Sequence, residues 1–326
     1  SRELAKRQLA VDAQRFNTLI RRGKFRPTLN ADATHEVDAE DTRANLSLRQ
    51  EFPAGFVLTT ALRGTNAHAR TDSADASVRL SKVILGGGSY RESMLDIDNS
   101  VIDEMIQLNL VHRYQRELAF QVQRDYYRLI RNHQTLRINE LRLERSKRNL
   151  EHAEERQRPL DIATAQIEVP DNESAVLRAQ REIQSALDAL KVLIGMDIDL
   201  PLAIQTEFTF AVRPVDVDAD IAFCRASHED VLNEGLRRRK IENEVPVQRA
   251  RNRPKVTVSG GSTRRSDDGM NLGGATDHSV GVALAWEIGS STERYRLAKL
   301  LTDLESKEID IADLMQTKAR SIRDLA

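Results

Sequence analysis

The acidic residues Asp216, Asp218 and Asp220 have the alternate spacing with which carboxylates begin a calcium-binding loop. Such a loop also needs a glycine at its sixth position and a glutamate at its twelfth, and this chain has Ile221 and Ser227 there. We therefore predict a solvated acidic connector at this place and no metal site.

Two other sets contain residue types that bind ligands in other proteins. The run 86–89 (Gly-Gly-Gly-Ser) is like a phosphate-binding loop, but no Lys-Ser/Thr pair follows it. Because glycine adopts backbone angles that other residues avoid, we predict a flexible strand-to-helix joint there. His112, His133 and His152 lie too far apart on one helix to share a metal. Since no Ser/His/Asp or paired-carboxylate arrangement is present, we predict that the protein is not an enzyme and has no cofactor.

The overall composition favours extended helices. The 326 residues include 49 Lys+Arg and 50 Asp+Glu, so the formal net charge is −1 and a nucleic-acid partner is not expected. Charged residues make up 30% and aromatic residues 4%, which suits a long helical rod better than a compact core. The single cysteine, Cys224, is expected to be a small packed residue. No apolar run reaches the roughly 18 residues of a membrane helix.

Long helices account for most of the apolar pattern. A helical pattern at 2–22 ends at Gly23, and both chain ends fall inside helical patterns, as expected for a fragment of a longer protein. Residues 89–154 lack proline and glycine, and at ~1.5 Å per residue they would form a rod on the order of 100 Å long. Apolar residues recur in this rod with the seven-residue period of a coiled coil, at Val122, Leu129, Leu136, Leu143 and Leu150.

A second helix is predicted at 160–194, because the intervening residues 155–159 allow only an antiparallel reversal. The residues that would pack against the first helix recur every three or four positions, at Val169, Asn172, Val176, Ala179, Ile183, Ala186, Leu190 and Leu193. Pro170 predicts a kink or a local opening between Glu168 and Asn172. A further helix is predicted at 219–251, in which the basic run 237–240 is either a solvated face or a contact with another subunit or with peptidoglycan.

Alternation with a period of two residues replaces the helical spacing in two regions. In 26–87, apolar residues alternate with polar ones around a turn at 52–55, which predicts three or four short strands. The pattern returns after residue 253: 26–29 matches 253–256, and 77–80 matches 279–282. We therefore predict an internal repeat of helix, β-hairpin and long helix, with an extra hairpin in the first copy.

Four segments carry a resemblance to a known family. They are 26–31 (Arg-Pro-Thr-Leu-Asn-Ala), 78–87 with its Gly-Gly ending, 160–166 (Leu-Asp-Ile-Ala-Thr-Ala-Gln) and 186–195 (Ala-Leu-Asp-Ala-Leu-Lys-Val-Leu-Ile-Gly). In this order the segments resemble the TolC-like outer-membrane efflux family over nearly the whole chain. The chain departs from the family pattern at Glu155 and Arg156, where glycine and leucine are usual, and at Pro170 within the returning helix.

The resemblance implies a mainly α fold with a β part. Long antiparallel coiled-coil hairpins would form a periplasmic α-barrel, and short antiparallel strands would join a trimeric transmembrane β-barrel in the outer membrane of a Gram-negative bacterium. The expected divisions are 1–25 (end of a first helix), 26–88 (barrel strands), 89–195 (helical hairpin), 196–220 (irregular equatorial connector), 221–252 (helix of the second repeat), 253–289 (second β-hairpin) and 290–326 (start of a second long helix).

Two sets of site residues follow from this reading. The turn between the long helices is the expected docking tip for a periplasmic adaptor, formed by Glu155, Arg156, Gln157, Arg158, Pro159, Leu160 and Asp161. On the strands, Arg49, Glu51 and Arg79 are expected to face the lumen, with Gly281. The lipid is expected to contact Leu46, Leu48, Val78, Leu80, Val280, Val282 and Leu284. Lys82 shares their phase, so its long stem is expected to reach water at the membrane edge.

The resulting functional expectation is a passive conduit, a homotrimer that works with an adaptor and an inner-membrane pump. It would belong to a tripartite efflux pump or a type I secretion system. Two alternatives stay open, a periplasmic adaptor and a soluble coiled-coil scaffold. An adaptor lacks a duplicated strand–helix unit, and a scaffold would explain the charged residues on the strands.

Overall fold

The computed structural model describes residues 2–36, 41–67, 73–87, 89–157, 159–204, 216–266, 274–286 and 292–325. The chain divides into two compact units. The hairpin unit contains Ser1–Leu9 and Leu110–Val215, and the strand unit contains Ala10–Asn109 and Asp216–Ala326. None of the described helices is long and apolar enough to cross a membrane.

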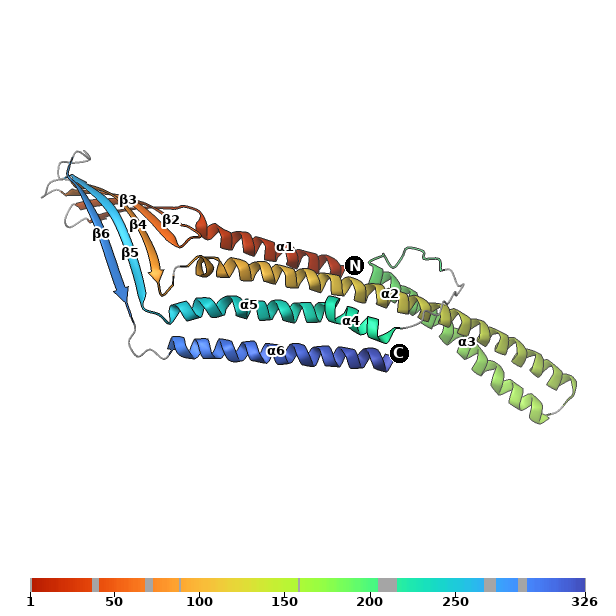
Figure 1. Cartoon of the computed structure of the whole chain (residues 1–326). Helices are drawn as coiled ribbons and strands as arrows, with labels where there is room; N and C mark the ends of the chain where they lie inside the picture. The colour runs from red at the N-terminus through yellow and green to blue at the C-terminus, as the bar shows by residue number, and fades with distance from the viewer. Residues whose placement is uncertain are drawn as a thin grey trace. The chain divides into compact units, whose positions relative to one another are not determined.

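The described residues of the strand unit form a six-stranded antiparallel sheet, in which neighbouring strands follow the order of the chain (Figure 1). Its strands are β1 (Thr28–Glu36), β2 (Asp41–Glu51), β3 (Phe56–Ala67), β4 (Ser73–Leu85), β5 (Lys255–Ser266) and β6 (Thr276–Ala285). The predicted turn at 52–55 connects β2 and β3, and Gly55 has the positive φ of 79° that a tight turn often needs. The first region thus forms four strands, the upper end of the expected number.

Helices of the strand unit lie side by side (Figure 1). They belong to α1 (Arg2–Arg22), which a 3-10 turn, η1 (Gly23–Phe25), follows, and to α2 (Tyr90–Glu155), α4 (Val217–Ser227), α5 (Glu229–Arg251) and α6 (Thr292–Leu325). Polar contacts join α1 to α2: the hydroxyls of Thr18 and Ser100 are 2.8 Å apart and buried, and Arg15 Nε is 2.9 Å from Glu104 Oε1. These polar contacts help to set the register of the two helices.

The predicted single helix at 219–251 is two helices. α4 and α5 are separated at His228, whose Nδ1 accepts a hydrogen bond from the backbone N–H of Asp230 (3.2 Å) and so caps α5. Helix α4 begins earlier than expected, at Val217, because Asp216 caps it by accepting from the N–H of Ala219 (3.1 Å). The acidic residues 216–220 are therefore a helix N-terminus, where negative charge is stabilised by the helix dipole.

The hairpin unit contains the distal part of α2 and all of α3 (Pro159–Ile194). The predicted coiled-coil seam is confirmed in its central part, because Leu129 is fully buried in a cluster with Ile183 and Leu190. Apolar residues packed against this cluster are Val122, Leu136, Ala186, Leu187, Leu202 and Ile204. The two helices also meet through an ion pair between Lys147 and Glu173 (3.0 Å).

Helix α3 is continuous through Pro170, so the predicted local opening between Glu168 and Asn172 is wrong. Both Pro170 and Gln166, whose carbonyl loses its hydrogen bond to the proline, are exposed. Water can therefore satisfy that carbonyl, and the helix continues across the position. A kink without interruption stays a prediction. A second internal proline, Pro246 in α5, lies where the sequence reading placed an ordinary helix.

Candidate functional site

The register of the sheet separates its side chains onto two faces. Direct cross-strand partners share a face, so Thr59 places Arg49 and Arg79 together, and Gly260 places Leu80 and Val280 together on the opposite face. All seven residues expected on the lipid side share the face of Leu80. Glu51 and Gly281 share the face of Arg49. Each of the two predicted sets therefore lies on one face of the sheet, and the assignment of these faces to lipid and lumen stays a prediction.

The face of Leu80 is apolar and widely exposed in this chain. Val280, Val282 and Leu284 on the edge strand β6 are 85%, 71% and 68% exposed. Other exposed large apolar residues of this face are Leu29, Leu46, Leu62, Val78 and Leu80. A contiguous apolar surface of this kind marks contact with lipid or with another protein.

The opposite face is polar and charged. Arg49 forms an ion pair with Glu51 two residues further along β2 (3.0 Å), and Arg265 of β5 forms one with Asp75 of β4 (3.0 Å). Arg79 is exposed, and no carboxylate in the described part of the chain pairs with it. Such side chains require water on this side of the sheet.

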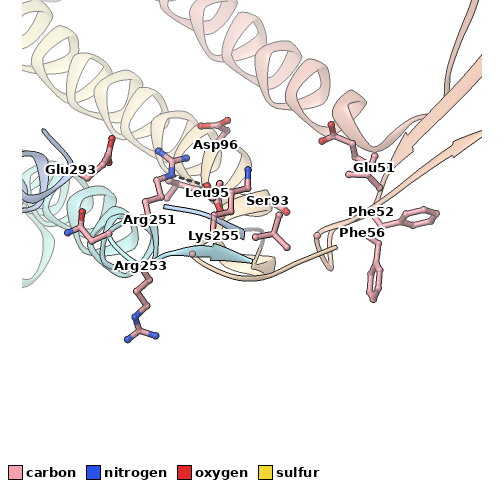
Figure 2. A pocket seen from close by; sticks show the side chains of 18 of the residues that line it. Glu51, Phe52, Phe56, Ser93, Leu95, Asp96, Arg251, Arg253, Lys255 and Glu293 are labelled. Atoms are coloured by element: carbon pink, nitrogen blue, oxygen red, sulfur yellow. Dashed lines mark hydrogen bonds and ion pairs between the residues drawn. The ribbon is translucent and has the colours of Figure 1, made fainter. Parts of the chain in front are cut away.

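The strands and helices meet at a hollow of about 950 Å³ (Figure 2). Its wall includes the β2–β3 turn, the start of α2, the end of α5, the end of β6 with Trp286, and the start of α6. Arg251 of α5 forms an ion pair with Glu92 of α2 across the hollow (2.9 Å). On β2, a carboxylate oxygen of Glu51 lies 3.0 Å from Arg49, and the other lies 3.9 Å from Lys24.

Glycine is required at the β4–α2 joint, as predicted. Gly86 has a φ of 75°, and a Cβ there would lie 2.5 Å from the carbonyl oxygen of Pro254. Gly87 has a φ of 140°, and Ser89 caps the new helix by accepting from the N–H of Glu92 (3.3 Å). Gly88 lies outside the described residues. The joint therefore places the start of α2 directly against the α5–β5 connection.

The predicted docking tip is the exposed end of the helical hairpin. Helix α2 ends at Glu155, exposed residues Arg156 and Gln157 form the turn, and α3 begins at Pro159, a favoured first helical residue. The residue with positive φ is Gln157 (53°), two positions after the expected glycine site at Glu155. Leu160 is 79% exposed, and Asp161 lies in the first turn of α3. Arg158 lies outside the described residues.

The basic run 237–240 is more constrained than a solvated face. Lys240 Nζ lies 2.7 Å from Asp103 Oδ1 of α2, and Arg238 pairs with Glu242 (3.1 Å) on its own helix. Next to this run, Lys307 of α6 reaches Glu234 of α5 (3.2 Å) and Asp310 (2.9 Å). The hydrogen bond to Asp310, followed by that to Glu234, raises the pKa of Lys307, and the hydrogen bond to Glu104 raises the pKa of Arg15.

Other candidate ligand residues do not converge. Within the described ranges, no three His, Cys, Asp or Glu side chains are grouped closely enough to hold a metal ion. His112 and His152 are exposed, and His152 contacts Glu155 of its own helix (3.3 Å). Cys224 is free and half-buried in α4.

Sequence reasoning missed the basic residues beside the strand–helix joints. They include Arg26 before β1 and Arg253 before β5, each followed by proline, and Lys255 at the start of β5. The signal was present as local excesses of Arg and Lys in 21–26 and 249–255. Because the net charge of the whole chain is close to zero, composition alone does not reveal them.

No model of a known protein family matches the sequence, and a comparison with curated proteins finds no match either. Solved structures do match. CusC, studied for conformational changes accompanying folding and transmembrane channel formation, has 14% identity and a TM-score of 0.69, over 99% of this chain and 71% of its own. A membrane protein from Pseudomonas aeruginosa has 19% identity and a TM-score of 0.69, over 98% and 72%.

The open-state MtrE outer membrane channel of Neisseria gonorrhoeae has 15% identity and a TM-score of 0.64, over 98% of this chain and 69% of its own. At these identities, the likeness concerns the fold. It extends over almost all of the chain and includes both the helices and the sheet. The chain therefore has the fold of the TolC-like outer-membrane channels, as its sequence resemblance predicted.

Proposed function

We propose that this chain is one protomer of an outer-membrane channel, a passive conduit in a tripartite efflux pump or a type I secretion system. The observation that carries the proposal is the six-stranded sheet, whose edge strands are β1 and β6 and whose one face is apolar and exposed. A membrane-spanning sheet must close, because an open edge leaves backbone groups without hydrogen bonds in lipid. Other copies of the chain supply the missing edges, and three copies complete the barrel.

The two faces of the sheet suit a barrel wall. The apolar face with Leu80 and Val280 contacts lipid, and the polar face with Arg49, Glu51 and Arg79 lines an aqueous lumen. The alternative of a soluble scaffold does not account for an exposed row such as Val280, Val282 and Leu284.

The helices fit the remaining parts of such a channel. They pool with those of the other protomers into a periplasmic α-barrel, whose hairpin ends meet the adaptor that links the channel to an inner-membrane pump. The tip residues Glu155–Asp161 form that docking site, with Leu160 as the apolar anchor and Arg156 and Arg158 as hydrogen-bond donors to acidic or carbonyl groups. The exposure of Leu160 supports this assignment.

We also infer that the chain is internally duplicated. The order helix, strands, helix occurs in α1, β1–β4 and α2, and again in α5, β5–β6 and α6. Similar Arg-Pro dipeptides precede β1 and β5. A periplasmic adaptor has no such repeat, which is the feature that favours the channel over this alternative.

The proposal is tested by expressing the full-length protein in a Gram-negative host, separating the membranes and examining unheated samples by gel electrophoresis. We expect a heat-modifiable trimer in the outer-membrane fraction. A monomer in the soluble periplasmic fraction would exclude the channel and favour an adaptor or a scaffold.

A matched pair of variants tests the assignment of the faces. Val280→Arg places a charge on the proposed lipid face and should destabilise the barrel by about 2–4 kcal/mol near the bilayer midplane. Ser279→Arg, one residue away on the polar face, should leave the yield of trimer close to that of the unmodified protein. Equal losses for the two variants would contradict the assignment.

A further inference from the structure

Exposed cations gather where the strands of this chain meet its helices. We call them the junction band; its members are Arg22, Arg26, Arg91, Arg253 and Arg294. They come from the four places at which the chain passes between helix and sheet, the α1–β1, β4–α2, α5–β5 and β6–α6 connections. All belong to the strand unit.

Three carboxylates near this band already have cationic partners outside it. Glu92 pairs with Arg251, Glu293 pairs with Arg296, and Glu51 has both Arg49 and Lys24 nearby. Among the described residues, no carboxylate is within ion-pair distance of Arg26 or Arg253, and these side chains are exposed. The band therefore carries a local excess of positive charge.

Two of these cations, Arg26 and Arg253, directly precede a proline. Proline at 27 and at 254 restricts the preceding arginine to an extended backbone, and Arg26 has φ −79° and ψ 146°. Figure 2 shows the consequence at Arg253, whose side chain points away from the helices, while Arg251 turns toward Glu92. Arg251 thus serves the internal ion pair and Arg253 remains available for a ligand.

An independent observation locates the band at a membrane boundary. Trp286, the only tryptophan of the chain, follows β6 directly and is 62% exposed. Phe52 and Phe56, on either side of the β2–β3 turn, line the same hollow and extend in different directions (Figure 2). Aromatic residues collect at the level of the lipid headgroups, and the exposed apolar row Val280–Leu284 begins next to Trp286.

We propose that the junction band binds the phosphate groups of anionic phospholipids in the membrane leaflet on the helix side. This proposal rests on the proposed function, because it requires the sheet to stand in a bilayer. Guanidinium groups bind phosphate through two parallel hydrogen bonds, and each basic residue near an anionic membrane surface adds roughly fivefold to the affinity. Bound headgroups would fix the depth of the barrel in the membrane.

Trp286 supplies the measurement. Any tryptophan elsewhere in the full-length protein is first replaced, so that only Trp286 fluoresces. The purified trimer in a neutral detergent is then titrated with phosphatidylglycerol or with phosphatidylcholine, and the fluorescence of Trp286 is recorded. We expect saturable binding of phosphatidylglycerol that weakens with salt, because exposed charges are screened. Phosphatidylcholine and free glycerol phosphate should give little change, which distinguishes a lipid headgroup from a soluble phosphate.

The double variant Arg26→Gln, Arg253→Gln should weaken phosphatidylglycerol binding by about 25-fold, from about fivefold for each residue. The matched control Arg237→Gln, Arg239→Gln removes the same charge from the middle of α5 and should bind as the unmodified protein does. Equal weakening in both variants would show a general effect of net charge and overturn the site.

The outcomes also separate the two proposals. An outer-membrane trimer that binds phosphatidylglycerol and phosphatidylcholine equally would overturn the headgroup site and leave the channel intact. A protein that forms no membrane trimer would overturn both. Binding of peptidoglycan fragments in place of phosphatidylglycerol, lost in the double variant, would reassign the band to the cell wall and contradict the lipid proposal.

Discussion

The ammonium group of Lys82 lies over the ring of Phe56, 4.2 Å from its centroid, and the two residues are direct partners on β4 and β3. Lys82 is in phase with the apolar face, where a free charge would be costly in lipid. The cation–π contact and the long aliphatic stem together allow the lysine to remain at the rim of the sheet.

Replacing Phe56 by Leu should therefore lower the stability of the folded sheet by about 0.5–1 kcal/mol, the usual strength of an exposed cation–π contact. The temperature at which the trimer dissociates on a gel measures this. In the background Lys82→Met, the same Phe56→Leu change should cost measurably less. Equal costs in both backgrounds would mean that the contact contributes nothing.

Cysteine labelling should report the alternation of β4. In a Cys224→Ser background, a membrane-impermeant thiol reagent should modify cysteine substituted for Arg79 and spare cysteine substituted for Val78 or Leu80, because neighbouring residues face opposite sides. The whole protein in outer-membrane vesicles is the sample. Similar labelling at the three positions would be incompatible with a barrel wall.

Gly86→Ala should be strongly destabilising. Its φ of 75° suits glycine, and the added Cβ would lie 2.5 Å from the Pro254 carbonyl oxygen, so we expect a loss of about 1–3 kcal/mol and less folded trimer. Gly235→Ala is the control, because no atom lies within 4 Å of its Cβ position and it is inside α5. That change should stabilise the helix by about 1 kcal/mol, so a loss in both variants would point to a cause other than the β4–α2 joint.

The joint replacement of Arg156 and Arg158 by alanine should reduce crosslinking to the adaptor and reduce efflux, with normal trimer levels. The contact should also weaken with salt, since the Debye length falls from about 10 Å at 0.1 M to about 3 Å at 1 M. A comparison with Arg145→Ala and Arg148→Ala, on the shaft of α2, controls for charge. Unchanged crosslinking and efflux would show that the tip arginines are only solvated.

Lys307 should stabilise the packing of α6 on α5 over a defined range of pH. Its raised pKa means that the folded state holds this proton more tightly than the unfolded chain does. The contribution of Lys307 to the free energy of unfolding is fully present below the ordinary lysine pKa of about 10.5. It disappears as the pH rises through the higher folded-state pKa. Lys307→Gln should cost about 0.2–1 kcal/mol at pH 7, and this cost should disappear as the pH rises through the folded-state pKa, measured by thermal unfolding against Lys299→Gln.

The sequence predicted the elements with strong periodicity. The run 89–154 without proline or glycine became α2, and the steps of three and four from Ile183 to Leu190 became the buried seam. The alternation of Val280, Val282 and Leu284 also gave their common face. These patterns succeed because one repeating contact surface determines which residues must be apolar.

The sequence predictions are wrong where a single local contact determines the backbone structure. The break at His228 depends on a side-chain cap that interrupts an otherwise uniform helical pattern, and the start of α4 depends on the Asp216 cap. At Pro170, the expected opening is absent because water can reach the freed carbonyl, and burial is not visible in the sequence. The ion pair between Lys240 and Asp103 joins residues 137 positions apart, so only the tertiary structure brings it to light.

The sheet has an even number of antiparallel strands, so its first and last strands run in opposite directions and the chain enters and leaves at the same end. In the proposed barrel, β6 of one copy would pair with β1 of the next, and the alternation of strand direction would continue across the seam without a parallel pair. Identical copies could then be added around a ring under one pairing rule. With an odd number, each seam would join strands of the same direction, and one end of each protomer would have to cross the membrane to return its helix to the common side.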